Sequence, residues 1–136
     1  MPYVQVITNV KVEDPKALIL EFSKLSSAAL GKPEVYMALS YEYNEYLIFD
    51  GNFDPAFSVN LTCAGALDEM KNDDVTKTLF EFLTSKLSVK PDRGYINYYD
   101  PGYGFIGYDG TTVANWLRDF KLKQAQKQLE STKISS

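Results

Sequence analysis

The chain has 136 residues, which suits one domain with a single core, and its apolar content of 45% fits a packed globule better than a disordered chain. It contains no histidine and one cysteine, Cys63, which excludes zinc sites, Ser-His and Cys-His catalytic pairs and an intramolecular disulfide. Residues 1–114 carry nine basic and sixteen acidic side chains, and this acidic balance argues against nucleic-acid binding.

The first half of the chain predicts a strand, a helix and a strand pair. Residues 3–8 are rich in β-forming types. Residues 14–31 predict a helix, with Asp14 as N-cap, Pro15 in the first turn and Gly31 at the stop. Its expected apolar face consists of Leu18, Phe22, Leu25 and Ala29. The aromatic-rich residues 35–52 predict two strands that turn near residues 42–45.

The second half repeats this order. Residues 55–65 predict a strand led by Pro55, and residues 72–74 are expected to cap a helix. The expected apolar face of this helix consists of Val75, Leu79, Phe82 and Lys86/Leu87, and residues 94–100 predict the next strand. The pattern indicates an α/β (α+β) fold of two βαβ units, with both helices on one face of the sheet. The other face of the sheet would need a cover, which makes it a candidate surface for oligomer formation.

The C-terminal residues 115–136 carry five basic and two acidic side chains, so their net charge is opposite in sign to that of residues 1–114. They predict a helical extension from about Trp116 to Leu129 that frays beyond Glu130. Trp116, Leu117 and Phe120 are expected to anchor its first turns. The chain therefore divides into a domain of residues 1–114 and an extension of residues 115–136.

Pro2 follows the initiator methionine directly and precedes the first predicted strand. Proline is tolerated at the first residue of a strand, which is one explanation of its position. The other is chemical, because removal of Met1 would leave a secondary amine in a sequence that offers few bases near neutral pH.

Four sequence stretches stand out: the initial MP, GKPEVYMAL at 31–39, FDGNFDPAF at 49–57 and KPDRGYINYYD at 90–100. Together they resemble the family of macrophage migration inhibitory factor and D-dopachrome tautomerase. The resemblance covers roughly residues 1–114. It implies a homotrimer whose subunits have a four-stranded mixed sheet. It also implies keto–enol tautomerase activity on phenylpyruvate-like or dopachrome-like substrates, without a cofactor or metal.

The resemblance also implies the site residues. The catalytic amine falls on Pro2, the pocket lysine on Lys32 and an amide donor on Asn97. Substrate-binding positions fall on Tyr36, Ala64, Tyr95, Ile106 and Tyr108, with Tyr95 and Asn97 coming from a neighbouring subunit. From the residues alone, Lys32 also fits a solvated helix end, the tyrosines fit strand packing, and Asn97 fits a partner for backbone groups. Ala64 stands where the family has a larger aliphatic residue in the wall of the substrate-binding pocket. The smaller side chain is expected to widen this pocket.

A second function is compatible with the same resemblance: a leaderless, cytokine-like signalling trimer whose pocket is vestigial or binds a partner such as a cell-surface receptor. Neither a signal peptide nor an apolar run of roughly 18 residues is present, so the expectation is a cytoplasmic protein with leaderless release and no stable membrane insertion. The family's redox CxxC motif is replaced by residues 56–59. The charged pair linked to receptor engagement falls on uncharged Val12 and Asn44, which argues against receptor mimicry.

Overall fold

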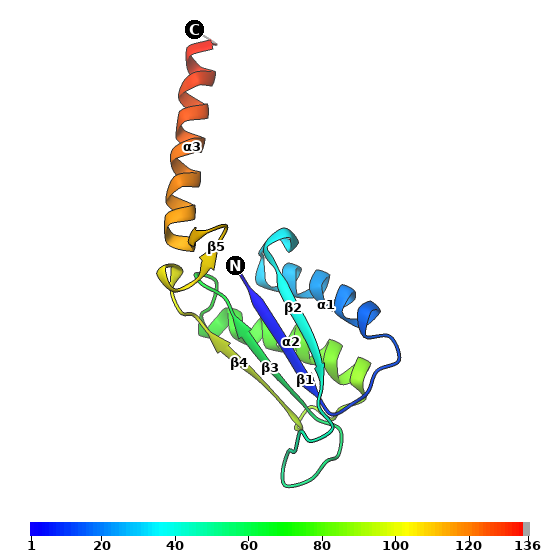
Figure 1. The fold of residues 1–136 in the computed structure, drawn as a ribbon. Helices are drawn as coiled ribbons and strands as arrows, with labels where there is room; N and C mark the ends of the chain where they lie inside the picture. The colour runs from blue at the N-terminus through cyan, green and yellow to red at the C-terminus, as the bar shows by residue number, and fades with distance from the viewer. Residues whose placement is uncertain (135–136) are drawn as a thin grey trace. The chain divides into compact units, whose positions relative to one another are not determined.

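The computed structural model describes residues 1–134 and contains a four-stranded mixed sheet with the strand order β2-β1-β3-β4 (Figure 1). Strand β1 is parallel to β2, β3 is parallel to β4, and β1 is antiparallel to β3. A helix connects the strands of each parallel pair, which confirms the two predicted βαβ units. The elements are β1 (Tyr3–Thr8), α1 (Pro15–Leu30), the 3₁₀ turn η1 (Glu34–Tyr36), β2 (Ala38–Tyr43), β3 (Phe57–Thr62), α2 (Glu69–Leu87) and β4 (Gly94–Tyr99).

Both helices pack on the same face of the sheet, behind it in Figure 1, as the sequence predicts. Because successive strand residues point to opposite faces, one set of alternate positions meets the helices. In β1 and β3 this set is buried and consists of Val4, Val6, Thr8, Phe57, Val59 and Leu61. Burying an aliphatic or aromatic side chain contributes about 1.5–3 kcal/mol, so this layer is the main source of stability. The other positions form the opposite face, which neither α1 nor α2 covers.

Helix α1 begins and ends where its sequence predicts. The Asp14 carboxylate accepts a hydrogen bond from the backbone N–H of Ala17, and Gly31 adopts the left-handed conformation that ends the helix. The buried face is Leu18, Phe22, Ser26 and Leu30, whereas the predicted Leu25 and Ala29 are only half-buried. The contact with the sheet therefore follows a spacing of four residues throughout.

Helix α2 begins earlier than predicted. The N-cap is Asp68, which accepts a hydrogen bond from the N–H of Lys71 at 2.8 Å, so residues 72–74 lie inside the helix. Several aspartates here are compatible with a cap, and the sequence pattern does not distinguish them. The buried face is Val75, Leu79, Leu83 and Leu87. Of the other predicted residues, Phe82 stacks on Phe22 at 5.2 Å, and Lys86 is exposed and pairs with Glu21.

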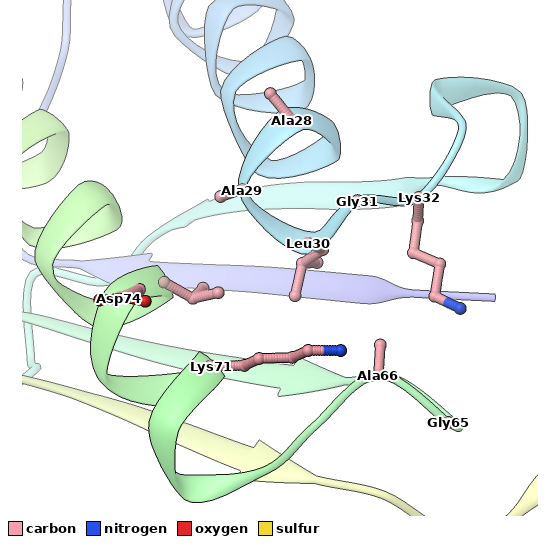
Figure 2. A pocket seen from close by; sticks show the side chains of 10 residues that line it. Ala28, Ala29, Leu30, Gly31, Lys32, Gly65, Ala66, Lys71 and Asp74 are labelled. Carbon is pink, nitrogen blue, oxygen red and sulfur yellow. The ribbon is translucent and has the colours of Figure 1, made fainter.

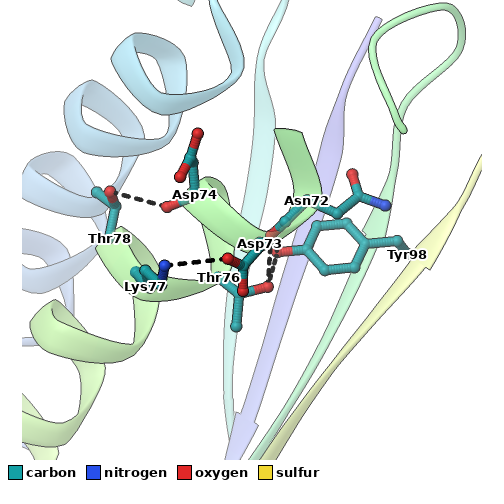
Figure 3. Close-up of polar contacts among 7 residues, drawn as sticks. All are labelled: Asn72, Asp73, Asp74, Thr76, Lys77, Thr78 and Tyr98. Atoms are coloured by element: carbon teal, nitrogen blue, oxygen red, sulfur yellow. Dashed lines mark hydrogen bonds and ion pairs between the residues drawn. The ribbon is translucent and has the colours of Figure 1, made fainter. Parts of the chain in front are cut away.

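A polar contact joins α2 to β4. The Thr76 hydroxyl donates to the carbonyl of Asn72 and lies 2.8 Å from the hydroxyl of Tyr98 (Figure 3). Burial raises the pKa of the Tyr98 hydroxyl above its usual value of 10.0, and the hydrogen bond with Thr76 partly offsets this shift. The nearby Lys77–Asp73 ion pair is solvent-exposed and contributes little to stability.

The second strand of the predicted pair at residues 35–52 does not form. Strand β2 ends at Tyr43, and the following segment is a loop with one isolated bridge between Phe49 and Asn52. Side chains from outside the loop satisfy its carbonyl groups in place of a neighbouring strand. Asn9 donates to the carbonyls of residues 47, 53 and 54, and Arg93 donates to those of residues 49, 54 and 55.

The chain separates into two compact units, 1–100 and 101–136, of which the second is described as far as residue 134. The second unit contains η2 (Tyr103–Phe105), the short strands β5 (Gly107–Tyr108) and β6 (Thr111–Thr112), and α3 (Val113–Ile134). Helix α3 is longer than predicted: it begins at Val113 and does not end near Glu130. Trp116 stacks on Phe120 at 5.3 Å and meets the edge of Tyr108 at 5.5 Å.

Candidate functional site

Pro2 lies directly before β1 and is fully buried. Its carbonyl accepts a hydrogen bond of 3.0 Å from the backbone N–H of Ala38, the first residue of β2. The position is therefore fixed on one side by β1 and on the other by the neighbouring strand. A residue in this environment has little conformational freedom.

Charged and titratable groups gather around this end of the sheet. Burial lowers the pKa of the terminal amine of Met1 below its usual value of 8.0; Cys63 opposes this shift, and Lys32 adds to it. Burial raises the pKa of the Cys63 thiol above 9.0, while the terminal amine and Lys32 oppose that shift. The terminal amine, the Lys32 ammonium and the Cys63 thiol therefore influence one another electrostatically.

Lys32 follows the C-cap of α1. Its backbone N–H donates to the carbonyl of Ser27 at 3.1 Å, and its carbonyl accepts a hydrogen bond from the Ser27 hydroxyl, so the backbone is held on both sides. The side chain lines a pocket of about 370 Å³ between the end of α1, the loop after β3 and the start of α2 (Figure 2). This volume lies within the range of small-ligand sites.

The lysine of α2 that lines the same pocket, Lys71, was not among the residues predicted from the sequence. Figure 2 shows its side chain extending from the first turn of α2 toward the space that Lys32 also enters. Helical periodicity places residue 71 on the surface of α2, and only the three-dimensional arrangement brings it to the Lys32 pocket.

Tyr36 and Ala64 occupy positions near this end of the sheet. Tyr36 is the last residue of η1, two residues before β2, and is half-buried. Ala64 follows Cys63 after β3 and is fully buried, and the next residue, Gly65, donates its N–H to the carboxylate of Asp100 at 3.2 Å. The predicted widening of a substrate slot by Ala64 remains a prediction.

Tyr95 and Asn97 do not meet Pro2 within one chain. In the sheet register, Asn97 lies beside Asn60 and Asn60 beside Gln5, which is three residues from Pro2 along β1. At about 3.3 Å per residue along a strand and 4.8 Å between strands, this exceeds hydrogen-bonding distance. Both side chains lie on the sheet face opposite α1 and α2. Asn97 donates to Asn60 at 3.3 Å, and Tyr95 packs on Phe49 at 5.3 Å.

Ile106 and Tyr108 belong to the second compact unit and are described within it. The carbonyl of Ile106 accepts a hydrogen bond of 2.8 Å from the N–H of Val113, the first residue of α3. Tyr108 lies in β5 and contacts the ring of Trp116. Both residues predicted to bind the substrate therefore contact the first turn of α3, Ile106 through its carbonyl and Tyr108 through its ring.

Two general features bear on the kind of site. Within residues 1–134, no cluster of three or more Cys, Asp or Glu side chains could hold a metal ion. No helix in the described part of the chain is long and apolar enough to cross a membrane.

Known proteins share both the sequence and the fold. A profile of macrophage migration inhibitory factor (MIF) matches residues 1–114. The chain is 33% identical over 115 residues to macrophage migration inhibitory factor of Rattus norvegicus, an alignment that covers 84% of this chain and 100% of the rat protein. The chain belongs to the macrophage migration inhibitory factor family.

Solved MIF structures agree with this assignment. The structure of macrophage migration inhibitory factor from Trichinella spiralis superimposes with a TM-score of 0.76 at 30% identity, covering 81% of this chain and 98% of that one. A MIF homologue from Prochlorococcus marinus gives a TM-score of 0.77 at 28% identity, covering 82% and 98%. The predicted family and fold class are thus confirmed, and helix α3 extends past the matched residues.

Proposed function

We propose that this protein is a keto–enol tautomerase that uses the secondary amine of Pro2 as its base once Met1 has been removed. The supporting observation is the environment of the chain terminus, where Pro2 is buried and the pKa of the terminal amine is lowered, mainly by burial and additionally by Lys32. Without Met1, the amine would sit one residue deeper in the same environment. A lowered pKa keeps more of the amine neutral at pH 7, and only the neutral amine accepts a proton.

The proposed reaction is a proton transfer. The neutral amine of Pro2 removes a proton from the carbon next to the substrate carbonyl, and the electron pair of the C–H bond forms the enolate. The enolate oxygen takes a proton from solvent to give the enol, the protonated amine of Pro2 returns its proton to solvent, and the reverse sequence returns the keto form. Lys32 binds a carboxylate of the substrate, and an amide N–H of Asn97 stabilises the developing negative charge on oxygen.

The proposed site is shared between subunits of a homotrimer. Separation of Asn97 and Tyr95 from Pro2 within one chain supports this, since a neighbouring subunit would have to supply them. The sheet face opposite α1 and α2 carries both residues, and their exposure there supports such an assembly. Family membership supports an oligomeric protein in the same way. Tyr36 and Ala64 would form part of a wall around a planar aromatic substrate, and Ile106 and Tyr108 remain predicted wall positions.

The names of the relatives favour a second candidate function, a cytokine-like role after leaderless release of a cytoplasmic protein. In that case a partner, such as a cell-surface receptor, would bind the assembled surface. The two functions differ in their need for a free amine, because catalysis requires it and a binding surface does not.

The test combines intact-mass measurement with a phenylpyruvate tautomerisation assay. The mass establishes whether Met1 is removed. We expect the trimmed protein to be active and a form with a blocked terminus, by retained Met1 or acetylation, to lose at least about tenfold in kcat/KM. Full activity of the blocked form would refute the amine mechanism. A trimmed but inactive oligomer would favour the signalling role.

A further inference from the structure

Two lysines from different elements line one pocket, and neither ammonium group has a hydrogen-bond or ion-pair partner within residues 1–134. Lys32 comes from the segment after α1 and Lys71 from the first turn of α2, and Figure 2 shows both side chains entering the same space. Asp74 also lines the pocket, so its charged side chains carry a net charge of +1. This positive site lies in a domain with a surplus of acidic side chains.

The position of Lys71 is not explained by helix stability. The N-terminus of a helix carries partial positive charge, so acidic residues are favoured in the first turn and a lysine is disfavoured. Lys32, in contrast, follows the C-terminal end of α1, where a cation is favourable. The Asp68 carboxylate is engaged with the backbone N–H of Lys71 as the helix cap. A lysine at residue 71 therefore fits binding of an anion better than stabilisation of α2.

We propose that Lys71 is a specificity-determining residue that binds a second carboxylate of the substrate, so that the site prefers keto acids with two carboxylates. This inference rests on the proposed tautomerase function. One carboxylate would be bound by Lys32 and the other by Lys71, because both side chains line the pocket. The pocket of about 370 Å³ has room for the part of the substrate that carries the second group.

The electrostatics of the pocket favour this class of ligand. A dicarboxylate presents two negative charges to two ammonium groups, and charge-assisted hydrogen bonds are stronger than neutral ones. Asp74, in the second turn of α2, would repel an anion placed next to it, which leaves the side of the pocket toward the two lysines as the favourable position.

The experiment compares phenylpyruvate with its analogue that bears a second carboxylate on the ring. Lys71→Met removes the charge and keeps most of the side-chain volume. We expect it to reduce kcat/KM for the dicarboxylate about tenfold more than kcat/KM for phenylpyruvate, mainly through KM. Lys71→Arg should retain the preference. Lys77→Met is the matched control, because Lys77 lies on the same helix, outside the pocket, and its loss changes the net charge equally.

The outcomes separate this inference from the proposed function. Equal losses for the two compounds in Lys71→Met, or the same selectivity change in Lys77→Met, would overturn the role of Lys71. If the trimmed parent turns over neither compound, the tautomerase function fails, and titration calorimetry with the same compounds still decides the binding preference. Tighter binding of the dicarboxylate that is lost in Lys71→Met would support the inference, and equal binding of both compounds would overturn it.

Discussion

The backbone N–H of Ala38 donates to the carbonyl oxygen of Pro2 across 3.0 Å, which ties the residue before β1 to the first residue of β2. This backbone hydrogen bond holds the second residue of the chain against the sheet. The position of a terminal amine at this point is consequently set by the strand pairing of the first βαβ unit.

The first prediction concerns Pro2. Pro2→Gly replaces a secondary amine with a primary one and removes the ring that fixes its direction, so we expect kcat/KM to fall at least tenfold, a loss of about 1.4 kcal/mol. Pro55→Gly is the control, because Pro55 precedes β3 as Pro2 precedes β1 and lies outside the proposed site. Kinetics on phenylpyruvate provide the measurement. An unchanged rate in Pro2→Gly would remove Pro2 from the mechanism.

Lys32 should affect both substrate binding and the titration of the base. Its charge lowers the pKa of the terminal amine, so in Lys32→Ala that pKa should rise. The neutral amine then forms only at higher pH, and the acidic limb of kcat/KM should move in that direction while KM for phenylpyruvate increases. Lys24→Ala, an exposed position on α1, serves as control. If the pH profile of Lys32→Ala overlays that of the parent, Lys32 is a solvated helix end.

A shared site predicts complementation between inactive variants. Pro2→Gly lacks the base and Asn97→Ala lacks the amide donor, so each homo-oligomer should have low activity. Trimers assembled from a mixture contain interfaces in which an intact Pro2 meets an intact Asn97. We therefore expect activity to reappear on joint refolding, measured with phenylpyruvate beside sedimentation analysis. A fully active monomer would contradict the shared site.

Cys63 and Tyr98 should make stability fall at alkaline pH. Each has its folded-state pKa raised by burial, from 9.0 and 10.0 respectively. Their contribution is complete below the unfolded pKa and is lost as pH rises through the folded value, because the unfolded groups ionise first. Urea unfolding from pH 7 to 11 should therefore show a decline that begins near pH 9 and is shallower in Cys63→Ala. Tyr98→Phe should reduce the decline near pH 10. Parallel curves for all three proteins would contradict this account.

The C-terminal helix should contribute to stability mainly through its beginning. Trp116 contacts Tyr108 and Phe120, whereas residues 121–134 are exposed in the chain. A chain that ends at Ala114 should lose about 1–2 kcal/mol from these aromatic contacts, and a chain that ends at Lys121 should lose little. Thermal unfolding of the two truncated proteins tests this. Docking of the first three turns on the trimer surface remains a prediction, and hydrogen exchange on the full chain would test it.

The sheet and the helices could be predicted from the sequence because both follow local patterns. Apolar and polar residues alternate along each strand, and apolar residues recur at helical spacing along each helix. The bounds of β1 and the caps of α1 could be predicted from local chemistry. The loop after β2 could not, because its carbonyls are satisfied by Asn9 and Arg93, which are distant in the sequence. Lys71 was missed for the same reason, since no local pattern reveals that its side chain enters the pocket of Lys32. The site itself came from the family resemblance, and its assembly across subunits stays a prediction.

The way in which Arg93 holds the loop after β2 has a consequence for tolerance to mutation. Its guanidinium contacts the backbone carbonyls of Phe49, Asp54 and Pro55, and a backbone carbonyl is the same whichever side chain the residue carries. The course of the loop is therefore largely independent of its outward-facing side chains, among them the exposed Tyr46, Ile48 and Phe53. Substitution at these three positions can change the outer surface without changing the path of the backbone. Replacement of Arg93, in contrast, would remove all three of its backbone contacts at once and leave those made by Asn9 to hold the loop.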